Sequence, residues 1–439
     1  MSGTLTACQD RALDEIMSAY RPGARHLLTG YAGTGKTYLM SSVAEQHRRM
    51  RRKVVLTAPT HKAVSVLRRK VAAAGLDLDC ITIHSLLGLQ PKADKAGTKL
   101  IRRKGAKIPA VDVVVVDEAS MIGLDLIHHI ERWLSHAFVL YVGDPAQLPP
   151  VGEARSPVFE TLRRSHLDTI VRQEADNPIL AAAHAIRASQ GGPMDWSWCK
   201  PAKAPPRGVF LPGAEADRWL HKAFTSAEFH ADNDRFRYLC YRNQRVAEVN
   251  AKVRRWLYGE TVAPFSVGER LLIRQPVFVD DAPVFATNEE APVAGIGPDE
   301  FVHSVESRCS VDGWTVRVPS WRVDLTTPAG TTVPVHIPRG QAGTQAVETA
   351  EARLIAEARE EGDRWEDRRM FLSALGKLQS SFALTIHTSQ GSTFRSVFLD
   401  VPDIRRRARD NVLEAQQLAY VGATRPTTSL MLVGAGEAA

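Results

Sequence analysis

The feature that most constrains this chain is a glycine-rich octapeptide at residues 30–37 with the pattern G-x-x-x-x-G-K-T. The apolar residues 26–29 before it predict a short buried strand, and residues 38–47 after it, rich in Leu, Met, Ser and Ala, predict a helix. A strand, such a loop and a helix in this order are typical of a phosphate-binding loop. The alternative is a glycine-rich turn that binds nothing, and the flanking strand and helix disfavour it.

The chemistry of phosphate explains the individual positions of this loop. Gly33 and Gly35 let the backbone around Thr34 curl, so that several N–H groups converge on one anion at the start of a helix. Lys36 is then expected to reach the β- and γ-phosphates, and the hydroxyl of Thr37 to bind Mg²⁺. The sequence therefore predicts a nucleotide site built on these five residues.

Length and cysteine usage limit the class of protein. At 439 residues the chain is too long for one hydrophobic core, which predicts two to four domains. No run of about 18 apolar residues occurs, and residues 1–10 lack the core of a signal peptide, so we expect neither a membrane span nor secretion. The five cysteines are scattered without a C-x-x-C pair. That argues against a disulfide framework or a zinc site and predicts the cytoplasm of a bacterium or a phage-infected cell.

The charge balance favours a polyanionic partner. The formal net charge is +7, and basic residues gather at 48–53, 92–107 and 405–409. Each cluster alone is more often a solvated face than a binding site. Basic charge therefore indicates nucleic acid only in combination with other features.

Further apolar runs at 54–58, 111–116 and 137–142 predict buried parallel strands, each followed by polar residues where ligands bind in open α/β sheets. Asp117 and Glu118 follow one of these runs. Asp117 is expected to hold Mg²⁺, and Glu118 to orient or deprotonate an attacking water. For the pair alone, an acidic turn would be the simpler explanation, but the preceding valine run and the phosphate-binding loop favour a nucleoside triphosphatase.

Residues 143–150 read Gly-Asp-Pro-Ala-Gln-Leu-Pro-Pro, and their Gln147 is placed to sense a γ-phosphate. The phosphate-binding loop, Asp-Glu-Ala-Ser at 117–120 and this segment, in this order, resemble superfamily 1 helicases. Ala-Pro-Thr-His-Lys-Ala at 58–63 and Thr-Ile-His-Ser at 82–85 resemble the RecD/Dda branch. The resemblance implies movement from 5′ to 3′ on single-stranded DNA.

The resemblance also implies roles for residues that would not stand out alone. It implies that Gln9 reads the adenine of ATP, and that DNA is contacted by Pro59, Thr60, His61 and His84. Hydroxyls and backbone amides at strand ends can contact phosphates, and His rings can stack on bases. Without the family match, such side chains are more often helix caps or solvated residues.

Residues 87–110 are basic and contain Gly105 and Pro109, which predicts a small β-hairpin or loop inserted in the first domain. In the resembled family, a hairpin at this place forms a wedge that splits the duplex and commonly carries an aromatic residue. This insert has none, so Leu100 or Ile101 would take that place. The missing aromatic residue concerns the efficiency of unwinding and not the expected translocation.

Two arginines are implied to contact the γ-phosphate. Residues 167–173 match the family segment that supplies the first, Arg172, and residues 418–425 match the last helicase segment, which supplies Arg425. Because Arg425 would come from a second core, it could report nucleotide state across a domain cleft. Without the family match, nothing in the sequence would mark either arginine as a site residue.

The second half of the chain predicts another α/β core, beginning with a strand and a helix at 236–257. Residues 262–338 are β-rich, with separate strands at 315–318 and 321–325, and resemble an SH3-like barrel inserted in the second domain of the family. Residues 345–380 predict helix.

The core resumes at residues 382–393, which in the family join DNA contact to the nucleotide cleft. This gives Thr385, His387 and Thr388 as DNA-binding residues and Gly391 as a nucleotide-binding residue. Thr388 stands where the family commonly has lysine, so one phosphate contact is lost.

We predict an α/β fold with two RecA-like parallel-sheet P-loop cores, an inserted hairpin and an inserted SH3-like β-barrel. The predicted domains are 1–185 (first core with the hairpin), 186–260 (linker and start of the second core), 261–380 (inserted β domain and helical segment) and 381–439 (rest of the second core).

The predicted function is an ATP- and Mg²⁺-dependent DNA helicase that couples hydrolysis to unwinding. Its catalytic residues are Lys36, Thr37, Asp117, Glu118, Gln147, Arg172 and Arg425. We expect a monomer that acts on single-stranded DNA and forked duplex, with single-stranded DNA-binding, replication, repair or recombination proteins as candidate partners. The alternatives are a translocase that displaces bound proteins and unwinds weakly, and a module that binds nucleotide and nucleic acid without catalysis. No sequence feature reads a 2′-hydroxyl, so the choice between DNA and RNA stays open.

Overall fold

A computed structural model describes residues 5–94, 97–150, 152–169, 178–189, 208–279, 282–306, 312–360 and 364–435 of the chain. The chain divides into two compact units. The first comprises Met1–Gly88, Lys104–Val253 and Phe382–Ala439, and the second comprises Leu89–Arg103 and Arg254–Ser381. In the described ranges, no helix is both long enough and apolar enough to cross a membrane.

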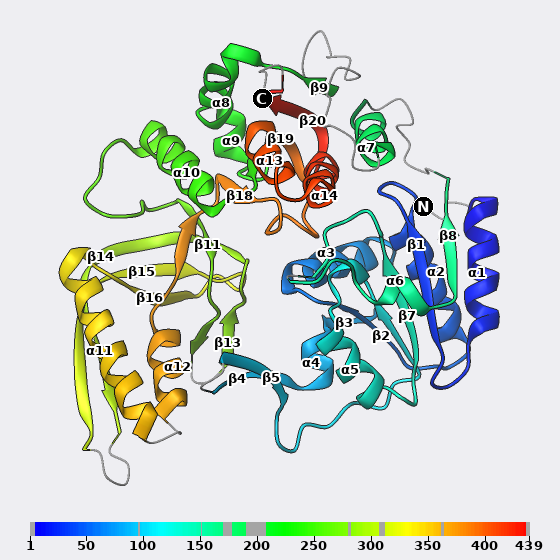
Figure 1. The fold of residues 1–439 in the computed structure, drawn as a ribbon, viewed down its shortest axis with the longest axis horizontal. Helices are drawn as coiled ribbons and strands as arrows, with labels where there is room; N and C mark the ends of the chain where they lie inside the picture. Colours follow the sequence, from blue (N-terminus) through cyan, green and yellow to red (C-terminus); the bar gives the residue numbers. More distant parts are fainter. Residues whose placement is uncertain are drawn as a thin grey trace. The chain divides into compact units, whose positions relative to one another are not determined.

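A six-stranded parallel sheet forms one core of the first unit (Figure 1). In spatial order its strands are β3 (Asp79–Thr82), β2 (Val54–Ala58), β6 (Val113–Val116), β7 (Phe138–Gly143), β1 (Arg25–Gly30) and β8 (Arg164–Leu167). Every residue of β2, β6 and β7 is buried, as expected for a parallel sheet with both faces covered. The three predicted buried strands are confirmed, each within two residues of its expected bounds.

Helices connect these strands. They are α1 (Ala7–Ala19), α2 (Lys36–Arg49), α3 (His61–Ala73), α4 (Ile83–Leu87), η1 (Ala119–Met121), α5 (Leu124–Trp133) and α6 (Val158–Thr161). Thr60 caps α3 by accepting a hydrogen bond from the N–H of Ala63, and Thr82 caps α4 in the same way. Both caps place the first turn of a helix directly at the end of a strand.

A five-stranded parallel sheet forms the second core of the same unit. Its strands in spatial order are β18 (Ala383–Thr385), β10 (Phe236–Cys240), β19 (Phe394–Asp400), β20 (Pro426–Val433) and β9 (Gly208–Phe210). The accompanying helices are α7 (Pro178–Ala188), η2 (Gly213–Glu215), α8 (Ala216–Phe224), α9 (Ala227–Ala231), α10 (Asn243–Tyr258), α13 (Val401–Ala408) and α14 (Val412–Ala423). Two parallel sheets therefore confirm the predicted α/β class.

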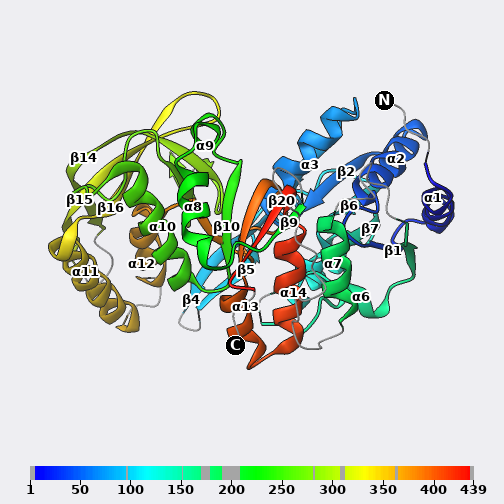
Figure 2. The ribbon, with the colours of Figure 1, turned by 90° about the horizontal axis from the view of Figure 1, so that it is seen from above.

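The second unit is built on an antiparallel sheet. Its strands in spatial order are β16 (Thr332–Pro338), β15 (Trp314–Thr326), β14 (Glu290–Val305), β11 (Arg270–Ile273) and β17 (Leu378–Ser380). Helix α11 (Gly340–Glu360) packs against β15 and β16, and α12 (Arg364–Ala374) packs against α11 (Figure 2). Two hairpins, β12 (Val277–Val279) with β13 (Ala282–Phe285) and β4 (Leu89–Asp94) with β5 (Gly97–Arg102), complete this unit.

Two expectations about the second unit are wrong. The predicted turn between 315–318 and 321–325 does not exist, because Pro319 and Ser320 stay extended opposite β14 and continue β15 as one strand. The helical segment also ends before residue 380, because Leu378–Ser380 pairs with β11 as β17. The β-rich character of 262–338 is confirmed.

Candidate nucleotide site and nucleic-acid interface

The phosphate-binding loop lies between β1 and α2, as its sequence pattern predicts. Gly33 and Gly35 have φ angles of 86° and 80°, a left-handed conformation that glycine adopts without steric cost. The ammonium of Lys36 donates to the carbonyls of Gly30 (2.6 Å) and Tyr31 (3.0 Å). These contacts direct the loop carbonyls to the lysine.

One pocket of about 510 Å³ in the first unit brings most of the predicted catalytic and nucleotide-binding residues together. The predicted residues that line it are Gly33, Gly35, Lys36, Thr37, Asp117, Glu118, Gln147, Gly391 and Arg425. Thr34 is buried behind the loop and does not line the pocket. The predicted residues in this pocket therefore come from five segments that are far apart in sequence.

Asp117 and Glu118 follow the end of β6 at the pocket wall. The N–H of Glu118 donates to Oδ1 of Asp117 at 2.9 Å, and Glu118 has a φ of 54°, a left-handed conformation that is strained for a residue with a Cβ atom. Burial and then the Asp117 carboxylate raise the pKa of Glu118, against the opposing charges of Arg425, Lys36 and Lys70. Backbone strain and a raised carboxyl pKa at one residue are typical of a functional site.

Gln147 lies in a turn that Asp144 stabilises. The Asp144 carboxylate accepts a hydrogen bond from the N–H of Ala146, and the Asp144 carbonyl accepts one from the N–H of Gln147. The Gln147 side chain is 8% exposed, and its Oε1 has no hydrogen-bond partner among the described residues. A buried polar atom without a partner is costly. Its position on the pocket wall fits contact with a water or a nucleotide group.

Arg425 follows α14 in the second core, yet it lines the same pocket. Its guanidinium donates to the carbonyls of Val421 (3.0 Å) and Ser392 (3.1 Å) and to Oγ1 of Thr424 (3.0 Å). Gly391 brings the neighbouring segment close to α3, because a Cβ atom there would lie 3.3 Å from Cβ of Ala63. These contacts hold the second-core wall of the pocket.

The residues present fit a magnesium ion. Thr37 and Asp117 provide a hydroxyl and a carboxylate in one pocket, and Mg²⁺ prefers such oxygen ligands. The described part of the chain contains no cluster of three or more His, Cys, Asp or Glu residues that could hold a metal. A metal here would therefore need water or phosphate oxygens to complete its coordination.

Sequence reasoning missed two polar residues of this site. Nζ of Lys70, in the last turn of α3, lies 3.2 Å from Oγ1 of Thr37. The hydroxyl of Tyr420, on α14, donates to Oδ2 of Asp144 (2.7 Å) and accepts a hydrogen bond from the N–H of Ala32 (3.1 Å). Tyr420 belongs to a segment that the family resemblance already singled out, whereas nothing in the sequence marks Lys70.

Gln9 does not line the pocket. It is 1% exposed, its Nε2 donates to the carbonyl of Thr34 (3.2 Å), and its Oε1 accepts from the N–H of Thr6 (3.0 Å). The second contact closes a capping box at the start of α1. In this arrangement the amide ties α1 to the phosphate-binding loop.

The residues expected to touch DNA in the first core lie at the starts of α3 and α4. The Thr60 side chain caps α3, and His61 is exposed in its first turn next to Pro59. His84 is half-buried, and burial lowers its pKa. His84 is therefore neutral at pH 7, a state that suits stacking or hydrogen bonding more than a fixed ion pair.

The corresponding residues of the second core lie at the end of β18, whose last residue is Thr385, and in the segment that follows it. Oγ1 of Thr385 accepts from the N–H of Thr388 at 3.2 Å, which closes a turn. His387 is half-buried beside the ring of Tyr241, and burial lowers its pKa. The hydroxyls of Thr385 and Thr388 also lie 2.9 Å apart within this turn, and their DNA contacts stay predictions. Arg172 lies outside the described residues.

Comparison with known protein families finds matches in the two regions of the chain that contain these segments. A family model described as an AAA domain matches residues 4–197, and one described as a UvrD-like helicase C-terminal domain matches residues 380–433. The chain is 25% identical over 452 residues to the RecD subunit of the RecBCD enzyme of Mycobacterium tuberculosis, a match that covers 93% of the chain and 66% of that subunit. In both matched regions the chain is similar to RecD-type DNA helicases.

Other relatives share only part of their length with the chain. The ATP-dependent RecD2 DNA helicase of Deinococcus radiodurans is 35% identical over 164 residues, which cover 36% of the chain and 21% of that helicase. An uncharacterised protein of Acanthamoeba polyphaga mimivirus is 33% identical over 164 residues, which cover 34% of the chain and 33% of that protein. The chain thus matches about a third or less of the length of these two relatives.

Solved structures share the fold of this chain. A Pif1 helicase from Bacteroides, in complex with ADP-AlF3 and ssDNA, superposes with a TM-score of 0.51 at 15% sequence identity. The superposition covers 98% of this chain and 92% of the Pif1 chain. At this identity the likeness concerns the fold alone.

Proposed function

We propose that this protein is an ATP-dependent DNA helicase that moves 5′ to 3′ along single-stranded DNA and unwinds duplex ahead of it. The observation that carries the proposal is the pocket in which Lys36 of the first core and Arg425 of the second line one cavity with Glu118. A nucleotide in that pocket would contact both cores. Hydrolysis can then change how the cores hold a DNA strand.

Each predicted residue has a chemical task in this proposal. Lys36 and Arg425, with Arg172 as a further candidate, neutralise the charge that develops on the transferring phosphoryl group. Glu118 accepts a proton from the attacking water, and Gln147 orients that water. Thr37 and Asp117 would hold Mg²⁺, which supplies charge neutralisation at the phosphate oxygens.

The strand of DNA is proposed to lie across the tips of both cores. Pro59, Thr60, His61 and His84 would contact it from the first core, and Thr385, His387 and Thr388 from the second. The net charge of +7 supports binding to phosphate without sequence preference, with an affinity that falls steeply with salt. The 5′-to-3′ direction is proposed from the resemblance to RecD-type helicases alone.

The inserted elements would act on the duplex. The β4–β5 hairpin is proposed as the wedge, with half-buried Leu100 or Ile101 in place of the aromatic residue common in the family. The five-stranded sheet of the second unit is proposed to be the counterpart of the SH3-like barrel, although its strand order is open, with β16 and β17 at its ends. We keep the domain limits 1–185, 186–260, 261–380 and 381–439 as part of this proposal.

The decisive experiment measures phosphate release from ATP with and without single-stranded DNA, followed by unwinding of duplexes with 5′ or 3′ tails. We expect DNA-stimulated turnover that Lys36→Ala abolishes, and unwinding of the 5′-tailed substrate. An equal rate of phosphate release with and without single-stranded DNA would contradict the proposal.

The wedge without an aromatic residue favours a second candidate function, a translocase that strips proteins from DNA and unwinds weakly. Displacement of streptavidin from a biotinylated strand, compared with unwinding of a forked duplex of the same sequence, separates the two activities.

A further inference from the structure

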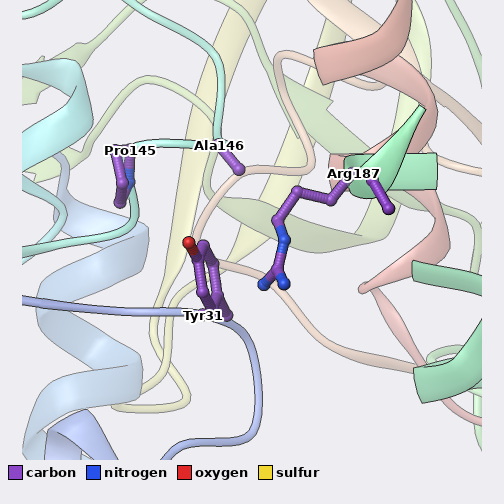
Figure 3. Close-up of a pocket in the computed structure, with 5 residues that line it drawn as sticks. Tyr31, Pro145, Ala146 and Arg187 are labelled. Atoms are coloured by element: carbon purple, nitrogen blue, oxygen red, sulfur yellow. The ribbon is translucent and has the colours of Figure 1, made fainter. Parts of the chain in front are cut away.

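Phe278, on β12 of the second unit, carries an aromatic ring that the fold leaves in solvent. This residue is 51% exposed, whereas every other phenylalanine and tryptophan in the described ranges is buried or half-buried. In the first unit, by contrast, a guanidinium covers the half-buried ring of Tyr31, with Cζ of Arg187 3.3 Å from the ring centroid (Figure 3). Phe278 and the adjacent Val279, which is 41% exposed, form an apolar patch, and such a patch indicates a contact surface.

The pairing within the β12–β13 hairpin explains why Phe278 is exposed. Val277 pairs with Phe285, and both pack on the core of the antiparallel sheet. The register then shifts between Val277 and Phe278, and Phe278 lies opposite the exposed Pro283. Shifts of this kind redirect side chains at the edge of a sheet. Two successive residues, Phe278 and Val279, therefore both face solvent.

The base of this hairpin is anchored to α12. Nε2 of Gln275 donates hydrogen bonds to the carbonyls of Leu372 (2.8 Å) and Leu375 (3.3 Å) at the end of that helix. Helix α12 also packs against β12 itself. A ring on a fixed base loses little freedom when it meets a ligand, which favours stacking.

The same helix packs against β4, so it connects the exposed ring to the basic β4–β5 hairpin (Figure 1). Lys92 and Lys99 pair directly across this hairpin, and both are exposed. Opposite residues of an antiparallel pair share one face, and like charges there repel each other. A phosphate beside the two ammonium groups would relieve that repulsion. One unit thus combines a ring suited to a base with cations suited to phosphates, which is the chemistry that recognises a nucleic acid.

We propose that Phe278 stacks on the last base pair of the duplex at a fork and supplies the aromatic surface that the β4–β5 hairpin lacks. The proposal rests on the proposed helicase function. Lys92 and Lys99 would contact phosphates of the same duplex. Apolar side chains that insert at base steps unstack them, and an aromatic ring stacks on every base regardless of sequence. Efficient unwinding then needs no aromatic residue in the β4–β5 hairpin.

Unwinding of a forked duplex with a 5′ tail, measured beside ATP hydrolysis stimulated by single-stranded DNA, tests the role of the ring in the full chain. Phe278→Ala should unwind about tenfold more slowly, because the stacked ring is lost. It should keep the rate of hydrolysis, because Phe278 does not line the nucleotide pocket. Phe278→Trp keeps a ring and should unwind like the wild type. Val302→Ala, at a valine on β14 that is 47% exposed, is the matched control.

Photocrosslinking locates the ring without any hydrolysis. The full chain is bound to a forked duplex that carries 5-iodouracil in the base pair at the junction, in one strand or the other. We expect a crosslink that maps to Phe278. The same base placed far along the single-stranded tail should give no crosslink to this residue.

Unwinding at the wild-type rate in Phe278→Ala, or a junction crosslink that does not map to Phe278, would overturn the proposal. A patch that docks a protein instead of DNA would give both of these results. Thermal unfolding verifies that each variant is folded, and the crosslink of the wild type decides the question even if Phe278→Ala is not. A failure of the proposed function would appear separately, as ATP hydrolysis that single-stranded DNA does not stimulate.

Discussion

The ammonium of Lys70 lies 3.2 Å from the hydroxyl of Thr37, the side chain that the loop pattern assigns to Mg²⁺. Lys70 is in the last turn of α3, and the first turn of the same helix carries His61, a predicted DNA contact. Thirteen residues of helix span about 20 Å. One rigid element therefore connects the predicted DNA surface to the nucleotide pocket.

Replacing Lys70 with methionine should increase the affinity of the pocket for Mg²⁺. A cation at the Thr37 hydroxyl opposes Mg²⁺ at the same oxygen, so Lys70→Met should lower the Mg²⁺ concentration that half-saturates binding of a fluorescent ATP analogue, by roughly fivefold for about 1 kcal/mol. Arg69→Met, at an exposed neighbour on α3, is the control. An unchanged midpoint would show that Lys70 does not compete with the metal.

The hydroxyl of Tyr420 offers a second test, because it joins α14 to two loops of the first core. Tyr420→Phe leaves the Asp144 carboxylate and the N–H of Ala32 without this partner, which should cost about 1–3 kcal/mol and lower the midpoint of thermal unfolding. Tyr141→Phe is the matched control, since the buried hydroxyl of Tyr141 has no partner in the described ranges. Equal midpoints for the two variants would contradict the role of Tyr420.

The parts of the site that follow from sequence are those set by local geometry. The loop at 30–37 and the pair Asp117 and Glu118 each follow an apolar run, and parallel strands bring their carboxyl ends to one edge of a sheet. Local patterns therefore placed these residues at the pocket without a structure.

The parts that escaped prediction depend on contacts between distant segments. Lys70 on α3 and Arg187 on α7 look like solvated helix residues, and only tertiary packing brings them to the loop. The continuity of β15 through Pro319 was missed for a related reason. Proline usually interrupts a strand, and here pairing with β14 overrides that preference.

Acid should destabilise the first core through His47. This side chain is fully buried against Tyr20 and Phe138, and burial with the nearby Arg52 charge lowers the pKa of His47 to about 4. Between about pH 6.5 and 4, the unfolded chain binds a proton that the folded chain does not. Stability is therefore lost as the pH falls through this window, by about 3 kcal/mol at most.

The variant His47→Phe keeps the ring packing and removes the titration. Its thermal midpoint should fall less steeply than that of the wild type between pH 6.5 and 4, even if loss of the Arg52 contact lowers its stability at pH 7. His136→Asn, at an exposed histidine, is the comparison. If both variants kept the acid profile of the wild type, His47 would not be the responsible group.

Glu118 is expected to affect both the rate of turnover and the stability of the fold. Burial and the Asp117 carboxylate raise the pKa of Glu118, so its charged form is unfavourable in the folded protein. The stabilising contribution of the protonated form is complete below the pKa of the unfolded chain, about 4.3, and is lost as the pH rises through the raised pKa. Glu118→Gln, which has no charge to lose, should therefore unfold at a higher temperature than the wild type at pH 8, and at nearly the same temperature near pH 4.

The same substitution should remove the base. Turnover in Glu118→Gln is expected to fall by roughly 10²–10⁴-fold, whereas binding of an ATP analogue is retained. In the wild type, turnover should rise with pH as the Glu118 carboxyl ionises. Glu160→Gln, at an exposed glutamate of the same core, is the control for both measurements. Full DNA-stimulated turnover in Glu118→Gln would exclude this carboxylate as the base, and a lower unfolding temperature at pH 8 would show that its charge is compensated by Lys36, Lys70 and Arg425.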